Sequence, residues 1–280
     1  TKHRAEPVIS DAKIGLRELS KILGDWKAPD NWIQRAKKEK NDWDAYVEKE
    51  SGPTNQEIPS YAQAVGAIYR NADQSDIVVS AAGGLVGELV QIWKPKQLNT
   101  FETEWGFSCM GYEISGGLGI KMAKPDQEVI VFIGDGSYLL HNSDIYSSIL
   151  YDKKLIIVVC DNGGHMVINR LQLAKGGKEY LCNLRSARAK NLEFVNFEAH
   201  AKSMGANAET VKSTSELESA FQRAKESDKT YVISIETHGY QWLEGTSFWE
   251  SPTLEVHTTE ENKKAYSDFI DGKKKQRKGV

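Results

Sequence analysis

The sequence predicts an α/β protein built on a doubly wound parallel sheet flanked by helices and preceded by a helical linker. Four short runs are continuously apolar and rich in β-branched residues, as expected of strands buried on both faces: DIVVSA, EVIVFIG, KLIIVVC and TYVISIE. Segments with a helical spacing of apolar residues lie between them, so strands and helices alternate along the chain. This order favours parallel strands joined by right-handed crossovers.

Residues 1–75 are predicted to be a helical linker or the end of a preceding domain. Trp32, Ala36, Trp43 and Val47 fall near one helical face, which we expect to pack on the main domain. Ser60 is a suitable N-cap for the helix that follows it.

Residues 76–240 form the predicted α/β domain, in which we expect four helices: GYEISGGLGIKMAK, NSDIYSSILYDKK, NFEAHAKSMGA and SELESAFQRAKES. Residues 241–280 are an aromatic-rich extension with a basic tail. The final KKKQRK is best explained as a solvated helix end and is given no function.

Composition limits the classes of partner. A formal charge of -3 and an isoelectric point near 6.1 give no general attraction to nucleic acid or to an anionic membrane, so we expect a small neutral or anionic ligand. No apolar run approaches the roughly 20 residues that span a bilayer, and the first residues lack the apolar core of a signal peptide. The three cysteines cannot all pair, and Cys160 lies inside an apolar run. We therefore expect a reducing, cytoplasmic location.

Two polar residues follow neighbouring predicted strands. Asp135 stands in GDG directly after EVIVFIG, and Asn162 follows KLIIVVCD. Ligands of open α/β sheets bind beyond the carboxyl ends of the strands, so these side chains are expected to converge. A carboxylate, an amide oxygen and a carbonyl freed by Gly163 and Gly164 suit Mg²⁺ or Ca²⁺ better than zinc. Because Mg²⁺ often completes its shell with phosphate oxygens, a diphosphate is the expected partner.

The glycines of GDG would let the chain approach that diphosphate closely, and Ser137 begins the next predicted helix. A second cradle for the phosphates is expected in SAAGGLVG, residues 80–87, where Gly83 and Gly84 follow the first strand. GDG alone would be explained as a tight turn. Its position after a strand, together with the second polar ending DNGG, favours a binding site.

At these residues the chain resembles the thiamin-diphosphate-dependent enzymes, whose signature is GDG followed at this spacing by a strand ending in Asn-Asn or Asp-Asn. The resemblance implies that Asp135, Asn162 and the carbonyl of Gly164 are ligands of Mg²⁺. It further implies four residues at the diphosphate, a bulky apolar wedge that holds the cofactor bent, and a carbonyl that accepts from its aminopyrimidine. These are Gly83, Gly84, Gly136 and Ser137, then Met110, then Ser108.

A longer stretch, from about Asp76 to Ser186, resembles the branch of the family that opens a cyclic 1,2-dione in myo-inositol catabolism. This implies hydrolysis of a carbon–carbon bond next to a carbonyl, with acid–base residues that the sequence does not identify. His141 and His165 depart from the pattern of that branch, which leaves the substrate preference open.

The family's cofactor lies between a diphosphate domain and a pyrimidine domain that carries a glutamate, usually on another chain. No segment here could supply the second domain, so we expect the 280 residues to be a C-terminal fragment or a separate subunit. Such a chain would be inactive alone and would work as a dimer or higher oligomer. Flavin binding stays open.

Three alternatives remain. An acetolactate-synthase-like carboligase or a decarboxylase would use the same metal and diphosphate residues. A non-catalytic subunit could retain the fold for assembly only. A nicotinamide-binding domain is weaker, because the glycines of SGGLGIK do not follow a convincing strand and fit helix packing better.

Overall fold

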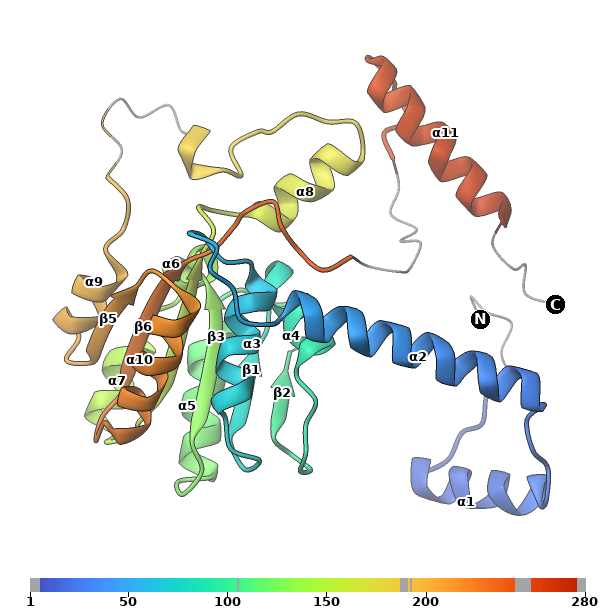
Figure 1. The fold of residues 1–280 in the computed structure, drawn as a ribbon, viewed down its shortest axis with the longest axis horizontal. Helices are drawn as coiled ribbons and strands as arrows, with labels where there is room; N and C mark the ends of the chain where they lie inside the picture. Colours follow the sequence, from blue (N-terminus) through green and yellow to red (C-terminus); the bar gives the residue numbers. More distant parts are fainter. Residues whose placement is uncertain (1–5, 105, 187–190, 192, 245–252, 276–280) are drawn as a thin grey trace.

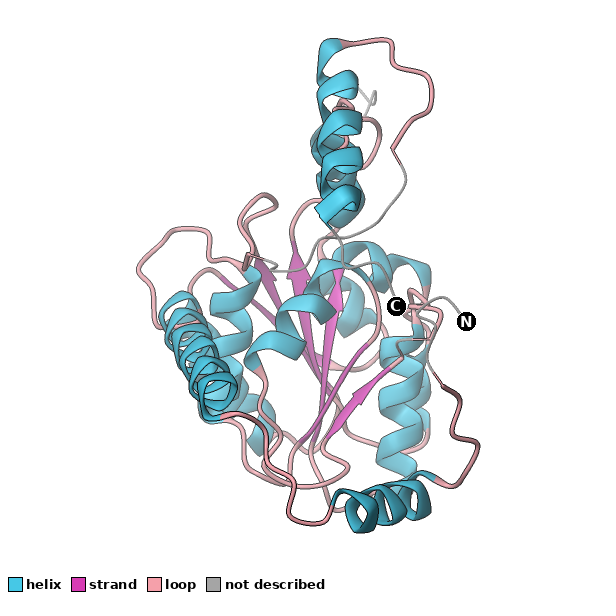
Figure 2. Cartoon of the chain, turned by 90° about the vertical axis from the view of Figure 1, so that its right-hand side faces the viewer, coloured by secondary structure: helices cyan, strands magenta, loops and turns pink. Residues whose placement is uncertain are grey.

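The chain folds around one parallel sheet with helices on both faces (Figures 1 and 2). The computed structural model describes all residues except 1–5, 105, 187–190, 192, 245–252 and 276–280. Its strands are β1 Ile77–Ser80, β2 Phe101–Thr103, β3 Val129–Gly134, β4 Ile156–Asp161, β5 Asn207–Val211 and β6 Tyr231–Glu236. Its α-helices are α1 Ala12–Leu23, α2 Asp30–Glu50, α3 Tyr61–Asn71, α4 Gly83–Ile92, α5 Tyr112–Ala123, α6 Asp135–Leu140, α7 Asp144–Leu150, α8 Met166–Ala174, α9 Phe197–Ser203, α10 Thr214–Glu226 and α11 Glu260–Lys275.

The strand order is β2-β1-β3-β4-β6-β5, and all neighbouring pairs are parallel. Gly134 at the end of β3 is in register with Cys160 near the end of β4. The residues that follow these two strands therefore emerge side by side at the carboxyl edge of the sheet, which is where open α/β sheets bind ligands.

The core has two halves, one on each face of the sheet. Along β3, Ile130 and Phe132 join the half that contains α3, α4 and α10, whereas Val131 and Ile133 join the half that contains α5 and α9. This alternation explains the continuously apolar strands. A β-carbon at Gly117 would lie 2.6 Å from Val131 Cγ2, so the glycine lets α5 approach β3 closely, as predicted for SGGLGIK.

The segment before β1 has two parts. Helix α3 is almost wholly buried and begins with the predicted cap, since the Ser60 hydroxyl accepts from Gln63 N and the Gln63 side chain accepts from Ser60 N. Helices α1 and α2 extend away from the sheet (Figure 1). Of the predicted helical face, Val47 is buried and Trp43 packs on the core, but Trp32 remains 64% exposed.

The predicted fold class is confirmed, with additions. All four apolar runs are strands, whereas β2 and β5 were not predicted. The crossover after β3 contains two short helices, α6 and α7, and α6 begins at Asp135 rather than at Ser137. The end of the basic tail, residues 276–280, lies outside the described residues. The three cysteines are free, and no described helix is both long and apolar enough to cross a membrane.

Candidate cofactor and metal site

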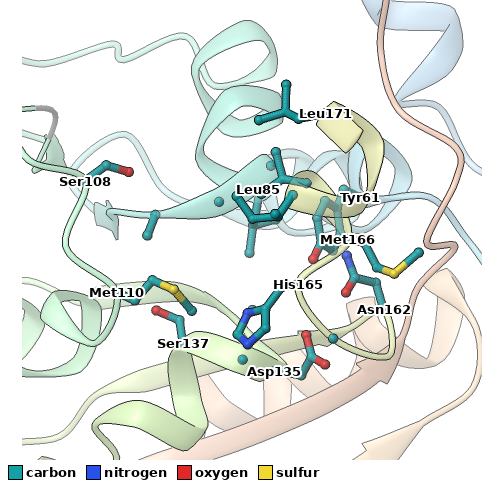
Figure 3. A pocket seen from close by; sticks show the side chains of 18 residues that line it. Tyr61, Leu85, Ser108, Met110, Asp135, Ser137, Asn162, His165, Met166 and Leu171 are labelled. Carbon is teal, nitrogen blue, oxygen red and sulfur yellow. The ribbon is translucent and has the colours of Figure 1, made fainter. Parts of the chain in front are cut away.

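A cavity of ≈ 320 Å³ opens at the carboxyl edge of the sheet (Figure 3). Loops and helix starts that follow β1, β2, β3 and β4 form its wall, and α3 adds one side chain. All nine residues singled out in the sequence line it: Gly83, Gly84, Ser108, Met110, Asp135, Gly136, Ser137, Asn162 and Gly164. The topology thus brings together residues that are as much as 81 positions apart, from Gly83 to Gly164.

Three polar groups converge on one side of the cavity. One terminal atom of the Asn162 amide lies 2.9 Å from the Gly164 carbonyl oxygen and 3.3 Å from Asp135 Oδ1. Adjacent ligands in an Mg²⁺ octahedron, with metal–oxygen bonds of about 2.0–2.1 Å, are about 2.9 Å apart. The Asn162 amide atom therefore lies from the Gly164 carbonyl oxygen as one ligand lies from its neighbour in such a shell, and slightly farther from Asp135.

The favourable orientation of the Asn162 amide depends on whether a cation lies among these three groups. With its nitrogen toward the cluster, the amide donates to the Gly164 carbonyl and to Asp135, and its oxygen accepts from the Tyr61 hydroxyl at 2.6 Å. With its oxygen toward the cluster, three oxygens face one another, which is favourable only around a cation. In the first orientation the Asn162 amide has hydrogen-bond partners without a metal, and in the second the three groups offer a hard oxygen set.

Asp135 is a buried carboxylate whose charge a cation would balance. Its side chain is 2% exposed, and its Oδ2 atom has no hydrogen-bond partner. Burial raises the pKa of Asp135, and the nearby Asp161 carboxylate adds to the rise. Among the described residues, no group of three or more His, Cys, Asp and Glu side chains could hold a metal. One carboxylate with amide and carbonyl oxygens fits Mg²⁺ rather than zinc.

Glycine backbones give the Asn162 loop its shape. Gly163 has a φ of 83° and Gly164 a φ of 134°, and a β-carbon at Gly164 would lie 2.4 Å from the Cys182 carbonyl oxygen. A second segment holds this loop, because Leu184 N donates to the Gly163 carbonyl at 2.8 Å and His165 N donates to the Cys182 carbonyl at 2.7 Å.

The opposite wall carries the remaining predicted residues. Ser108 and Met110 lie across the cavity from Tyr61 and Asn162 in Figure 3, and Met110 is 39% exposed. Ser108 has a φ of 52°, and its hydroxyl donates to the Ala81 carbonyl at 3.3 Å, which ties this wall to the end of β1.

Two histidines that departed from the family pattern have different positions. The His165 ring lines the cavity and lies against Gly136, where a β-carbon would meet His165 Cε1 at 2.7 Å. His141 is outside the cavity lining and pairs with Asp144 through its Nε2 atom at 3.3 Å. Of the two, His165 therefore borders the space where a ligand would bind.

Two polar side chains at or beside the cavity, those of Tyr61 and Glu113, were not singled out in the sequence analysis. Tyr61 comes from α3, within the segment predicted to be a linker, and burial raises its pKa well above the usual range. Glu113, in the first turn of α5, accepts from Ser137 and from two loops of the cavity wall. An acidic residue inside an otherwise apolar helix is the signal that could have indicated Glu113.

Comparisons with known proteins identify the family of the chain. Residues 81–235, more than half of the chain, match the family described as thiamine pyrophosphate enzyme, C-terminal TPP binding domain. In solved structures, a similar chain is the Rhodococcus jostii RHA1 thiamine diphosphate-dependent 4-hydroxybenzoylformate decarboxylase, with a TM-score of 0.56 at 18% identity. That match covers 66% of this chain and 34% of the other, and it indicates a shared fold.

Curated relatives extend the match over most of the chain. A 3D-(3,5/4)-trihydroxycyclohexane-1,2-dione hydrolase of Halalkalibacterium halodurans is 33% identical over 94% of this chain and 45% of its own length. The enzyme of the same name from Bacillus licheniformis is 32% identical over 92% of this chain and 44% of its own length. The chain thus spans less than half the length of these relatives. It belongs to the thiamine pyrophosphate enzymes, and residues 81–235 are its C-terminal TPP binding domain.

Proposed function

We propose that this chain is the diphosphate- and metal-binding part of a thiamin-diphosphate-dependent hydrolase. The proposed enzyme cleaves a carbon–carbon bond of trihydroxycyclohexane-1,2-dione in inositol catabolism and yields 5-deoxyglucuronate. The spacing of Asp135, Asn162 and the Gly164 carbonyl carries the proposal for the metal and cofactor. The names of the curated relatives, at 30–33% identity, support the substrate.

In this proposal Asp135, Asn162 and Gly164 hold Mg²⁺, which neutralises the buried Asp135 carboxylate. Mg²⁺ characteristically takes its remaining ligands from phosphate oxygens and water. The diphosphate would then lie against the backbones of Gly83, Gly84, Gly136 and Ser137, which line the same cavity.

When bound, thiamin diphosphate supplies a carbon nucleophile and an electron sink for cleavage of a bond next to a carbonyl. The chain's own residues bind and orient. Met110 would support the bent cofactor, and the Ser108 carbonyl would accept from its pyrimidine ring. His165 lies beside this space and is a candidate for contact with the substrate.

The catalytic unit requires more than this chain. The proposal includes a pyrimidine-binding domain, from another chain or from a segment beyond these 280 residues, and a cytoplasmic enzyme that works as a dimer or higher oligomer. It rests on the family's shared cofactor site and on the length of the relatives, which is about twice that of the aligned part.

The first test is calorimetric titration of the chain with thiamin diphosphate in Mg²⁺ and in EDTA. We expect binding only with metal, and at least about a tenfold loss of affinity in Asp135→Asn, since that change removes one metal–carboxylate bond. The matched control is Asp76→Asn. Asp76 is another buried carboxylate, but it precedes β1 at the amino end of the strand, away from the cavity, so affinity should stay unchanged.

The titration is then repeated with a separately prepared pyrimidine domain, which should tighten binding. Metal-independent binding, or equal affinity in Asp135→Asn, would contradict the proposed site. Product analysis of the assembled enzyme with the cyclic dione and with pyruvate decides the reaction. Turnover of pyruvate alone would favour a decarboxylase or carboligase.

A further inference from the structure

Glu113 is a buried carboxylate at the junction of three cavity loops. It lies in the first turn of α5 and is 1% exposed. Its Oε1 accepts from Ala82 N at 3.3 Å, in the loop after β1, and its Oε2 accepts from Gly111 N at 2.9 Å, beside Met110. Both oxygens accept from the Ser137 hydroxyl, at 2.8 and 2.9 Å, in the helix after β3.

The Ser137 hydroxyl is fully committed to this arrangement. It donates its one hydrogen to Glu113 and accepts from Gly111 N at 2.9 Å. A hydroxyl has a single hydrogen, so Ser137 has none left for a ligand in the cavity. The Ser137 side chain therefore acts on the cavity through the neighbours that it binds.

The hydrogen bond from Gly111 N to Glu113 fixes a turn that only glycine adopts easily. Gly111 has a φ of 92°, and a β-carbon there would lie 2.6 Å from His141 Cβ. Gly111 joins Met110 to the first residue of α5, and the Glu113 carboxylate holds this turn by accepting from Gly111 N. One buried side chain thus links the wall that carries Met110 to the two phosphate cradles.

We propose that Glu113 is a positioning residue that fixes these three loops in the arrangement needed to bind a diphosphate. This inference rests on the proposed function, because it assigns Glu113 a role toward the same cavity. Glu113 itself is outside the cavity lining and acts through Ala82, Gly111 and Ser137.

A carboxylate is required because every neighbour in this network is a donor. Ala82 N, Gly111 N and the Ser137 hydroxyl all direct hydrogens at Glu113, and two oxygens can accept them all. A glutamine would turn an NH₂ group toward at least one N–H donor, and that donor would lose its carboxylate acceptor in a buried place. Burial raises the pKa of Glu113, and these donors oppose the rise by stabilising the charged form.

The test compares Glu113→Gln with Asp76→Asn in the full chain. Asp76 is 3% exposed and also accepts from a backbone N–H, that of Asp73. It lies before β1, at the amino ends of the strands and away from the cavity. Two quantities are measured: the affinity for inorganic pyrophosphate with Mg²⁺ by calorimetry, and the exchange rates of the Ala82 and Gly111 amide hydrogens by NMR.

We expect Glu113→Gln to weaken pyrophosphate binding at least about tenfold. Exchange should speed at least about tenfold at whichever of the two amides faces the new NH₂ group, since that amide loses its carboxylate acceptor. Asp76→Asn should reduce stability without changing either quantity. Unchanged exchange in Glu113→Gln, or an affinity within about twofold of the original, would overturn the inference. If the unaltered chain binds no pyrophosphate, the proposed function fails, and amide exchange still decides whether Glu113 holds the loops.

Discussion

At the scale of single residues, the site depends on backbone conformations that only glycine adopts easily. Gly164 is the clearest case, because its carbonyl is one of the three converging polar groups and its φ is 134°. The adjoining segment at Cys182 leaves no room for a side chain there. The loop that carries Asn162 is therefore held in shape by the lack of a β-carbon.

We expect Gly164→Ala to lower the free energy of unfolding by at least about 2 kcal/mol, from backbone strain and a collision with the Cys182 carbonyl. Urea denaturation measures this change. The control is Gly119→Ala in α5, where a β-carbon meets nothing within 4 Å and where alanine should be neutral or stabilising by up to about 1 kcal/mol. Equal stability of the two variants would show that Gly164 is not constrained.

The residues that sequence could predict were those fixed by topology. Asp135 and Asn162 follow strands, and strand ends of a parallel sheet meet at one edge, so their convergence followed from the strand assignment alone. Glu113 and Tyr61 could not be predicted in this way. Their roles arise from loops and a helix that meet only in three dimensions, and neither residue follows a strand.

At the scale of elements, α3 is the N-terminal helix that is almost wholly buried in the core, whereas α2 contributes Val47 at its end. Helix α3 packs against α10 and α4 and places the Tyr61 hydroxyl beside the Asn162 amide. Helix α1, in contrast, has no buried residue, although Asp11 caps it by accepting from Lys13 N and Ile14 N. The two caps have similar chemistry and different consequences for the fold.

Ser60→Ala should therefore lower the free energy of unfolding by about 0.5–2 kcal/mol, because α3 loses its cap within the cooperative core. Asp11→Ala, the matched change on α1, should leave the main unfolding transition in place and reduce only the helical circular dichroism. The two denaturation midpoints measure the contrast. A large shift from Asp11→Ala would mean that α1 unfolds together with the core.

The strands that sequence analysis missed lie at the two edges of the sheet. β2 has only three residues, and β5, NAETV, mixes polar and apolar side chains because it is less buried than the central strands. Continuous apolar runs identify strands covered on both faces and fail for edge strands. The predicted sheet was therefore correct in its four central strands and lacked its two edge strands.

At the scale of the whole molecule, residues 237–243 cross from the end of β6 back to α4. Leu243 N donates to both oxygens of Glu88, at 2.9 and 3.1 Å, and Thr237 N donates to the Asp161 carbonyl at 2.7 Å. Glu88 is buried, and burial raises its pKa to about 7, against the opposing effects of the Leu243 N–H and of Arg170. The segment is thus anchored on a carboxyl group that titrates near neutrality.

This raised pKa gives stability a pH dependence of known sign. The folded state binds the Glu88 proton more tightly than the unfolded state, so the contribution of Glu88 to stability falls as pH rises from about 4.5 to about 7. Glu88→Gln removes this titration and keeps an oxygen to accept from Leu243 N. We expect the variant to gain up to about 3 kcal/mol relative to the original between pH 5 and pH 8, by urea denaturation. A stability difference that does not change with pH would contradict a raised Glu88 pKa.

The strand order has a consequence for synthesis of the chain. Within the described part of the chain β5 pairs only with β6, yet it precedes β6 in the sequence, and β6 takes the place between β4 and β5. A ribosome therefore releases β5 before its one partner exists. The nascent sheet can assemble β2, β1, β3 and β4 as they emerge, but β5 must wait, with open backbone hydrogen-bonding groups, until Tyr231–Glu236 has left the exit tunnel. The last step of sheet formation is thus the pairing of β6 with β4, which also adds β5 to the sheet.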